Sequence, residues 1–205
     1  MKTRVIKTGS PGWIEAAVQV LKQGWLAAFP TDTVYGLGAL ASDPSAIDGL
    51  YRVKRRDMSK AIPVLIGDLG DIDKVALDMA EYALELARRF WPGPLTLVVA
   101  KYPNLPEILS PGETIGVRMP DHPDALHLLK TAGPLAVTSA NRSGGSNSLT
   151  AVEAVDQLGG LIDLVLDGGR CPGGNPSTVV DCTGDEPLIL RKGPISLDQI
   201  WEVIS

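Results

Sequence analysis

The chain has 205 residues, of which 44% are hydrophobic and 21% charged, with a formal net charge of −5. This composition is that of a soluble globular protein, and the length suits one domain. No apolar run approaches the roughly 20 residues needed to span a bilayer, and no signal peptide is recognisable, so we expect a cytoplasmic protein without membrane contact. The acidic balance argues against tight nonspecific nucleic-acid binding by the whole surface, but allows a local basic groove.

Short apolar runs rich in β-branched residues alternate with amphipathic stretches along the chain. This interleaving predicts one α/β domain, over residues 10–200, built on a single large sheet. The predicted strands are residues 25–29, 63–66, 95–99, 115–118, 135–138, 164–166, 178–180 and 188–190. The predicted helices are residues 13–22, 44–53, 72–90 (with a break left open), 124–131, 152–158 and 197–203. Asp43, Thr150 and Ser196 are predicted helix caps.

The first polar segment, residues 29–38, follows a predicted strand and contains small hydroxyl residues and two spaced glycines. Such a segment lets a ligand approach the backbone closely, at the strand ends where open α/β sheets place ligands. The alternative is a capped turn that enters a helix. A phosphate loop of the Walker type is excluded, because no Gly-Lys-Ser/Thr follows.

The second segment is basic, with four cations among residues 52–56 and a further one at Lys60. Like charges this close repel one another, and a bound anion such as a phosphate offsets that repulsion. The alternative is a solvated helix end, where cations meet the carboxyl-terminal dipole. If the backbone beyond the helix is extended, Lys54 and Arg56 point the same way and converge on one anion.

Two more polar segments leave predicted strands. Arg118 ends an apolar strand and suits a bidentate contact with a carboxylate, or else a simple salt bridge. In residues 138–144, Ser139 and Asn141 either face one ligand or form a local side-chain turn.

The patterns of several catalytic classes are missing from the sequence. It contains no GxSxG elbow, no Ser-His-Asp pattern, no candidate cysteine nucleophile and no dense carboxylate cluster. Cys171 and Cys182 are expected to be reduced and buried, and neither they nor His122 and His127 have the spacing of zinc ligands. Positioning, charge neutralisation and water exclusion remain, and these are the tools of phosphoryl and nucleotidyl transfer.

Seven segments, taken in order, cover the chain from about residue 10 to 200: PTDTVYGLG at residues 30–38, KxR at 54–56, WPGPLT at 91–96, VRMP at 117–120, SxN at 139–141, PSTVVD at 176–181 and LRKGPI at 190–195. Together they resemble the YrdC family of threonylcarbamoyl-AMP synthases. The resemblance implies a curved mixed β-sheet surrounded by helices, with a basic concave cavity. It also implies a reaction in which L-threonine, bicarbonate or CO2, and ATP give threonylcarbamoyl-AMP and pyrophosphate. Other proteins would then use this adenylate to modify an adenosine beside the anticodon of tRNA.

By position, the resemblance implies that Thr33 and Arg118 hold threonine, with Arg118 on its carboxylate. Lys54 and Arg56 would be the catalytic pair on the ATP phosphates. The remaining implied ATP-binding residues are Lys60, Thr114, Ser139, Asn141 and Arg191. We expect Mg2+ to arrive with ATP, held mainly by phosphate oxygens and water, with no protein metal ligands.

The chain departs from parts of the family at three points. Leu65 stands where some members have a threonine-contacting histidine, and Lys60 stands where some have asparagine. The chain also ends after the catalytic domain, so we expect it to pass its product to partner proteins.

Two rival hypotheses share the basic cavity. One is a non-catalytic module for double-stranded RNA or tRNA, which would bind the backbone, since only Tyr35 is a stacking candidate near the basic segment. The other is a carbamoyl-transferring domain, which normally belongs to a larger chain.

Overall fold

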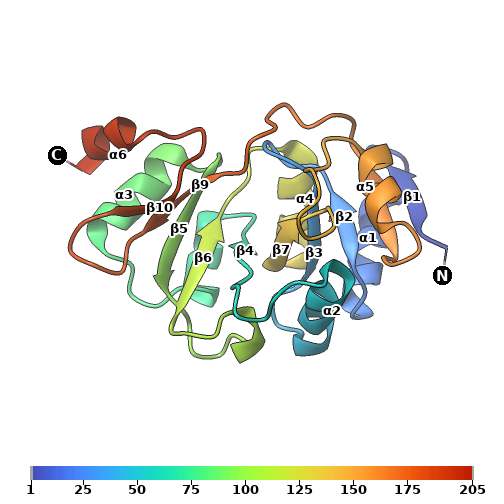
Figure 1. The fold of residues 1–205 in the computed structure, drawn as a ribbon, viewed down its shortest axis with the longest axis horizontal. Coiled ribbons are helices and arrows are strands. Elements are labelled where there is room, and N and C mark those ends of the chain that lie inside the picture. Colours follow the sequence, from blue (N-terminus) through green and yellow to red (C-terminus); the bar gives the residue numbers. More distant parts are fainter. Residues whose placement is uncertain (1, 205) are drawn as a thin grey trace.

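The computed structural model describes residues 2–204, and ten strands in this part of the chain form one mixed sheet. The sheet order is β1-β8-β2-β3-β7-β4-β6-β5-β9-β10 (Figure 1). The strands are β1 Arg4–Lys7, β2 Ala27–Phe29, β3 Gly36–Leu40, β4 Val64–Leu65, β5 Leu95–Ala100, β6 Thr114–Arg118, β7 Leu135–Ser139, β8 Leu164–Asp167, β9 Thr178–Asp181 and β10 Leu188–Arg191. The α-helices are α1 Trp13–Lys22, α2 Pro44–Lys54, α3 Glu81–Phe90, α4 Pro123–Ala132, α5 Ala151–Leu158 and α6 Leu197–Ile204, with 3-10 turns at Leu69–Lys74 and Glu107–Leu109. The predicted α/β fold with one large mixed sheet is confirmed.

Side chains alternate between the two faces of the sheet, because successive residues of a strand point in opposite directions. On one face, Phe29, Val137 and Leu166 pack with α1 and α4, two helices that contact each other behind the central strands and the right-hand strands of Figure 1. On the other face, Ala28, Ala136 and the neighbouring apolar residues pack with α2, α3, α5 and α6. The helices therefore cover both faces of the sheet.

Over β6, β5 and β9, the first of these faces borders a cavity instead of packing against helices. Here Val117 and Leu97 point into the core on the other side, whereas their neighbours Arg118 and Thr96 point to a cavity. The same two-residue alternation that builds the core thus directs polar side chains from several strands into one space.

Two strands were missed by the sequence prediction. β1 is mostly exposed and pairs only with β8 at the edge of the sheet, and its Arg-Val-Ile-Lys sequence is too short to show the apolar pattern of a buried strand. β3 contains Gly36 and Gly38, which indicated a loop rather than a strand. It pairs with both β2 and β7, and a Cβ at Gly38 would lie 2.9 Å from the Phe29 ring. The glycines therefore allow close packing inside the sheet, and no helix follows the turn.

The other predicted elements lie where expected, with shifted ends. Asp43, Thr150 and Ser196 accept backbone N–H groups at the starts of α2, α5 and α6, as predicted. The predicted helix at residues 72–90 is broken into a 3-10 turn and α3, and Asp78 between them has a φ of 43°.

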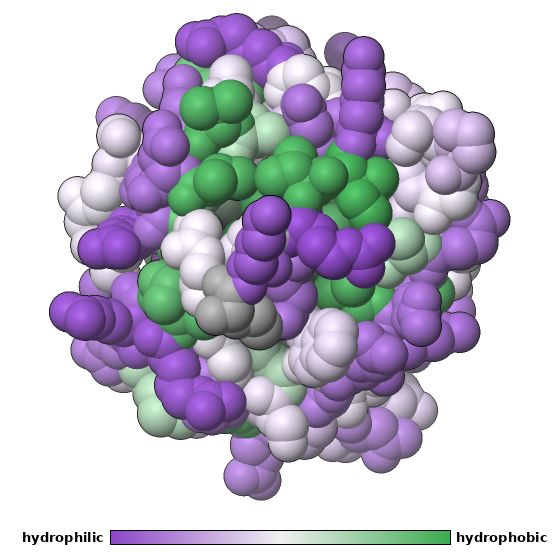
Figure 2. Space-filling model, turned by 90° about the vertical axis from the view of Figure 1, so that its right-hand side faces the viewer, coloured by the Kyte–Doolittle hydropathy of each residue, from purple (hydrophilic) through white to green (hydrophobic). Residues whose placement is uncertain are grey.

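The end of the molecule near β1 and α5 carries exposed apolar residues, among them Val5, Val152 and Leu161. Figure 2 views this end and shows an apolar area bordered by hydrophilic residues.

In residues 2–204, every helix is too short or too polar to cross a bilayer.

The segment after β10 is held tightly against β9. The Thr178 hydroxyl donates to the Ile195 carbonyl and accepts from the Ile195 N–H, at 2.8 and 2.9 Å. Gly193 lies in the same segment, and a Cβ added to it would lie 2.3 Å from the backbone nitrogen of Thr178. We expect Gly193→Ala to lower the free energy of unfolding by about 1–3 kcal/mol, because backbone rather than a flexible side chain must move.

Urea unfolding measures this loss, and Gly112→Ala is the matched control, because no atom lies within 4 Å of the added Cβ there. Equal midpoints for the two variants would show that the contact is not tight.

Candidate functional site

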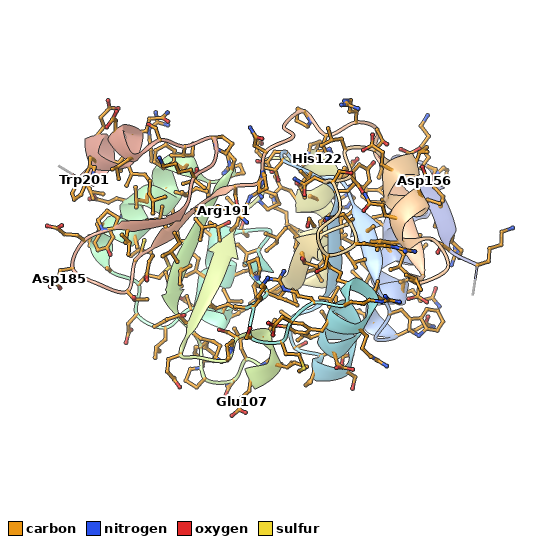
Figure 3. The ribbon with its side chains drawn as sticks, in the orientation of Figure 1. Glu107, His122, Asp156, Asp185, Arg191 and Trp201 are labelled. Carbon is orange, nitrogen blue, oxygen red and sulfur yellow. The ribbon has the colours of Figure 1, made fainter. Side chains whose placement is uncertain are left out.

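A cavity of about 330 Å³ opens on the sheet face over its central and C-terminal strands. Its floor comes from residues of β7, β4, β6, β5 and β9, and its charged lining consists of Arg56, Arg118 and Arg191. Figure 3 shows Arg191 towards the middle of the molecule, away from Asp185 and Trp201 at the outer end. The strand order thus brings together three arginines that are far apart in the sequence.

Arg118 is the most deeply buried of these arginines, with 6% of the residue exposed. Nε donates to the Gly93 carbonyl at 3.0 Å, one terminal nitrogen donates to the Thr33 hydroxyl at 3.1 Å, and the other is ion-paired with Asp32. A guanidinium has five N–H groups, so these bonds leave one on each terminal nitrogen for a further acceptor. The salt-bridge alternative for Arg118 is therefore present, and a bidentate contact stays geometrically open.

Burial lowers the pKa of Arg118, and Asp32 opposes this effect by stabilising the charged form. A second, smaller lowering comes from Arg191 across the cavity. Burial also lowers the pKa of Arg191. The Arg118 guanidinium thus carries a desolvation cost, which a bound anion relieves, whereas Arg191 is exposed and carries less of it.

Thr33 is placed by a turn between β2 and β3. The Thr31 hydroxyl accepts the N–H groups of Thr33 and Val34 and donates to the Val34 carbonyl at 2.7 Å. Thr31 and Thr33 both line the cavity, whereas Asp32 between them lies behind Arg118. The segment predicted from its hydroxyls and glycines is therefore a cavity wall.

Lys54 lies just outside the cavity lining and is buried, with 4% of the residue exposed. Its ammonium donates to the Ser139 carbonyl, to the Ser139 hydroxyl at 3.2 Å and to Asn141 Oδ1 at 3.4 Å. Burial, with a smaller contribution from Arg56, lowers its pKa to about 8. The ammonium is thus fully used within the protein, and an anion must take the place of one of its acceptors.

The predicted extended backbone at residues 54–56 is wrong. Lys54 is the last residue of α2, and Arg55 has a left-handed φ of 50°. Arg56 still lines the cavity. Its guanidinium is held there by hydrogen bonds to the carbonyls of Lys60 and Ala61, at 3.2 and 2.8 Å. Arg55 is exposed, and Arg52 is exposed and pairs with Asp48.

Only some of the other predicted nucleotide-binding residues line the cavity. Ser139 and Arg191 line the cavity, whereas Lys60 and Thr114 do not, and Lys60 is exposed. Asn141 lies behind Ser139, where its amide donates to the carbonyls of Arg142 and Gly145. The roles of Lys60, Thr114 and Asn141 stay predictions.

Sequence reasoning did not single out Asp32, Thr96 or Ser177. Ser177 accepts from Arg191 at 3.1 Å and shares a hydrogen bond of 2.7 Å with Thr96, and both hydroxyls line the cavity. All three residues lie inside the quoted motifs, and their position there was the available signal.

Comparisons of the sequence with known proteins point to one protein family. The Sua5, YciO and YrdC family, described as "Telomere recombination", matches residues 19–193. A putative threonylcarbamoyl-AMP synthase of Mycobacterium tuberculosis is 43% identical over 93% of this chain and 88% of that protein. The threonylcarbamoyl-AMP synthase of Bacillus subtilis is 39% identical over 98% of this chain but 59% of that protein.

Solved structures give the same result. The Sua5 protein of Pyrococcus abyssi in complex with L-threonine superposes with a TM-score of 0.94 at 37% identity, covering all of this chain and 61% of that one. The YciO protein of Escherichia coli gives a TM-score of 0.87 at 26% identity, covering 97% and 99%. The chain therefore spans about 60% of its longer relatives and nearly all of its shorter ones.

The buried ammonium of Lys54 predicts a pH dependence of stability. Its pKa in the folded chain, about 8, lies below the ordinary 10.5. Between these values the unfolded chain binds more protons, so the free energy of unfolding rises with pH. We expect Lys54→Met to remove this contribution, which is at most about 1.4 kcal/mol per pH unit.

Urea unfolding across this pH range measures the difference from the wild type. Lys60→Met, at an exposed lysine, serves as the control and should keep the rise. A Lys54→Met slope that parallels the wild type would contradict a buried, titrating ammonium.

Proposed function

Because the chain belongs to the Sua5, YciO and YrdC family, we propose that it is an L-threonylcarbamoyladenylate synthase. It condenses L-threonine, bicarbonate or CO2, and ATP into threonylcarbamoyl-AMP, with release of pyrophosphate. The observation that carries the proposal is a cavity lined by three arginines, with the Lys54 ammonium behind its wall. The threonine complex of the Pyrococcus abyssi relative supports the choice of amino acid.

The threonine carboxylate binds at Arg118, whose two uncommitted N–H groups match a carboxylate in number. Thr33 lies beside it and offers a hydroxyl on the cavity side. Leu65 also lines the cavity, so an apolar side chain stands where some family members have a threonine-contacting histidine.

The triphosphate binds towards Arg56 and Arg191, with Lys54 reaching it after giving up one of its acceptors at Ser139 or Asn141. These cations neutralise the charge that develops on the leaving pyrophosphate. We assign the catalytic role to Lys54 and Arg56, and nucleotide contacts to Ser139 and Arg191. Lys60, Thr114 and Asn141 join the nucleotide set only if they move on binding.

The chemistry needs positioning more than a protein nucleophile. The unprotonated threonine amine adds to CO2 and loses a proton, and a carbamate oxygen then attacks the α-phosphorus of ATP as pyrophosphate leaves. Holding both substrates in one cavity makes this attack effectively intramolecular.

Mg2+ bound to the ATP phosphates would further stabilise the leaving group, held there mainly by phosphate oxygens and water. Among residues 2–204, no three His, Cys, Asp or Glu side chains lie close enough to hold a metal ion.

Partner proteins in the cytoplasm would then transfer the threonylcarbamoyl group to tRNA. A non-catalytic RNA-binding module is the second candidate, because the same basic cavity mouth suits a phosphate backbone. Steeply salt-dependent tRNA binding without ATP turnover would favour it.

The decisive experiment measures pyrophosphate release from ATP with bicarbonate, in the presence and absence of L-threonine. We expect release only with threonine, and threonine-independent release would point to another acceptor. Arg56→Ala and Lys54→Ala should each lower the rate by about ten- to a hundredfold, since each removes a charge-assisted contact.

Arg52→Ala is the matched control, because Arg52 lies in the same basic segment but is exposed and ion-paired with Asp48. Wild-type rates for Arg56→Ala and Lys54→Ala would overturn the assignment of both residues.

Arg118→Lys should raise the KM for threonine by about tenfold or more while changing the KM for ATP little, because lysine keeps the charge but loses the bidentate contact. Steady-state kinetics with each substrate varied in turn separates the two effects. An equal rise in both KM values would argue against a threonine site at Arg118.

A further inference from the structure

The three arginines of the cavity differ in what balances their charge. Arg118 is ion-paired with Asp32. Arg56 donates to the carbonyls of Lys60 and Ala61, and Arg191 donates to Ser177 alone. Over residues 2–204, neither of these two is in a salt bridge. The charge of Arg118 is therefore balanced by a carboxylate, whereas the charges of Arg56 and Arg191 are not.

The position of Asp32 makes this neutralisation a property of the cavity wall. Its side chain is 11% exposed and contacts Arg118 from outside the cavity lining, between Thr31 and Thr33, which do line the cavity. Asp32 therefore acts on a ligand through Arg118 and leaves the two uncommitted N–H groups of the guanidinium available.

We propose that Asp32 sets the anion specificity of the Arg118 guanidinium, making it accept a singly charged carboxylate and reject phosphates. A carboxylate needs one bidentate partner and little net charge. Pyrophosphate and triphosphate carry several charges, and they favour cations without a carboxylate partner, such as Arg56 and Arg191.

This division solves a problem of the proposed reaction, on which the inference rests. Both substrates are anions, and three equivalent arginines would let ATP or released pyrophosphate occupy the amino-acid position. With Asp32 in place, a polyphosphate at Arg118 would repel the Asp32 carboxylate at close range. The two substrates are thereby directed to different arginines.

The test titrates inorganic pyrophosphate into the protein by calorimetry, with and without saturating L-threonine. In the wild type we expect threonine to leave the pyrophosphate affinity unchanged, because the two sites are distinct. Competition between threonine and pyrophosphate in the wild type would overturn the proposal without any variant.

Asp32→Asn keeps an acceptor for Arg118 but removes the charge. We expect it to bind pyrophosphate about tenfold more tightly or at a second site, and threonine should now displace that pyrophosphate. Adding Arg118→Met to Asp32→Asn should abolish the gain. Asp121→Asn, at an exposed carboxylate three residues after Arg118, is the matched control.

Unchanged pyrophosphate binding in a folded Asp32→Asn variant would overturn the proposal, and thermal unfolding verifies the fold. None of the pyrophosphate comparisons needs turnover. If threonine-dependent pyrophosphate release fails but the titrations succeed, the reaction is overturned while Asp32 still separates the two anions; if only the titrations fail, the role of Asp32 alone is overturned.

Discussion

The two-residue period of the β-strands is the constraint on which the rest of this structure depends. Along β6, Val117 enters the core while Arg118 enters the cavity, and along β5, Leu97 and Thr96 divide in the same way. A slip of one residue would bury the arginine in the apolar core and expose the valine. The apolar core packed against α2, α3, α5 and α6 therefore fixes the register, and the register delivers the site.

Gathering cations, two of them buried, in a chain of net charge −5 requires local compensation, and the site uses different means for each one. Arg118 has a carboxylate, Arg191 has a serine hydroxyl and carbonyl, and Lys54 has two carbonyl-type oxygens and a hydroxyl. Neutral acceptors satisfy donors but leave the charge in place. The site thus keeps a positive field at the positions without a carboxylate, which is the field a polyphosphate requires.

Much of this arrangement was predictable because it depends on residues that are close together in the sequence. The cap at Asp43 and the apolar runs of β5 and β6 follow from residue type and spacing. β3 was not predictable in this way, since Gly36 and Gly38 are explained only by the Phe29 and Val137 side chains packed against them. The Arg118–Asp32 pair joins residues 86 positions apart, so only the folded sheet brings it together.

The basic segment and the Ser-x-Asn segment, read separately in the sequence, form one physical unit. Lys54 donates to both Ser139 and Asn141, and Asn141 in turn holds the carbonyls of Arg142 and Gly145. An anion that draws the Lys54 ammonium into the cavity must loosen these bonds, since the ammonium has three donors and all are used. The position of the Lys54 ammonium is thereby mechanically linked to the loop at residues 142–148. The hydrogen bonds from Gln157 to Ser146 and Ser148 limit how far that loop moves.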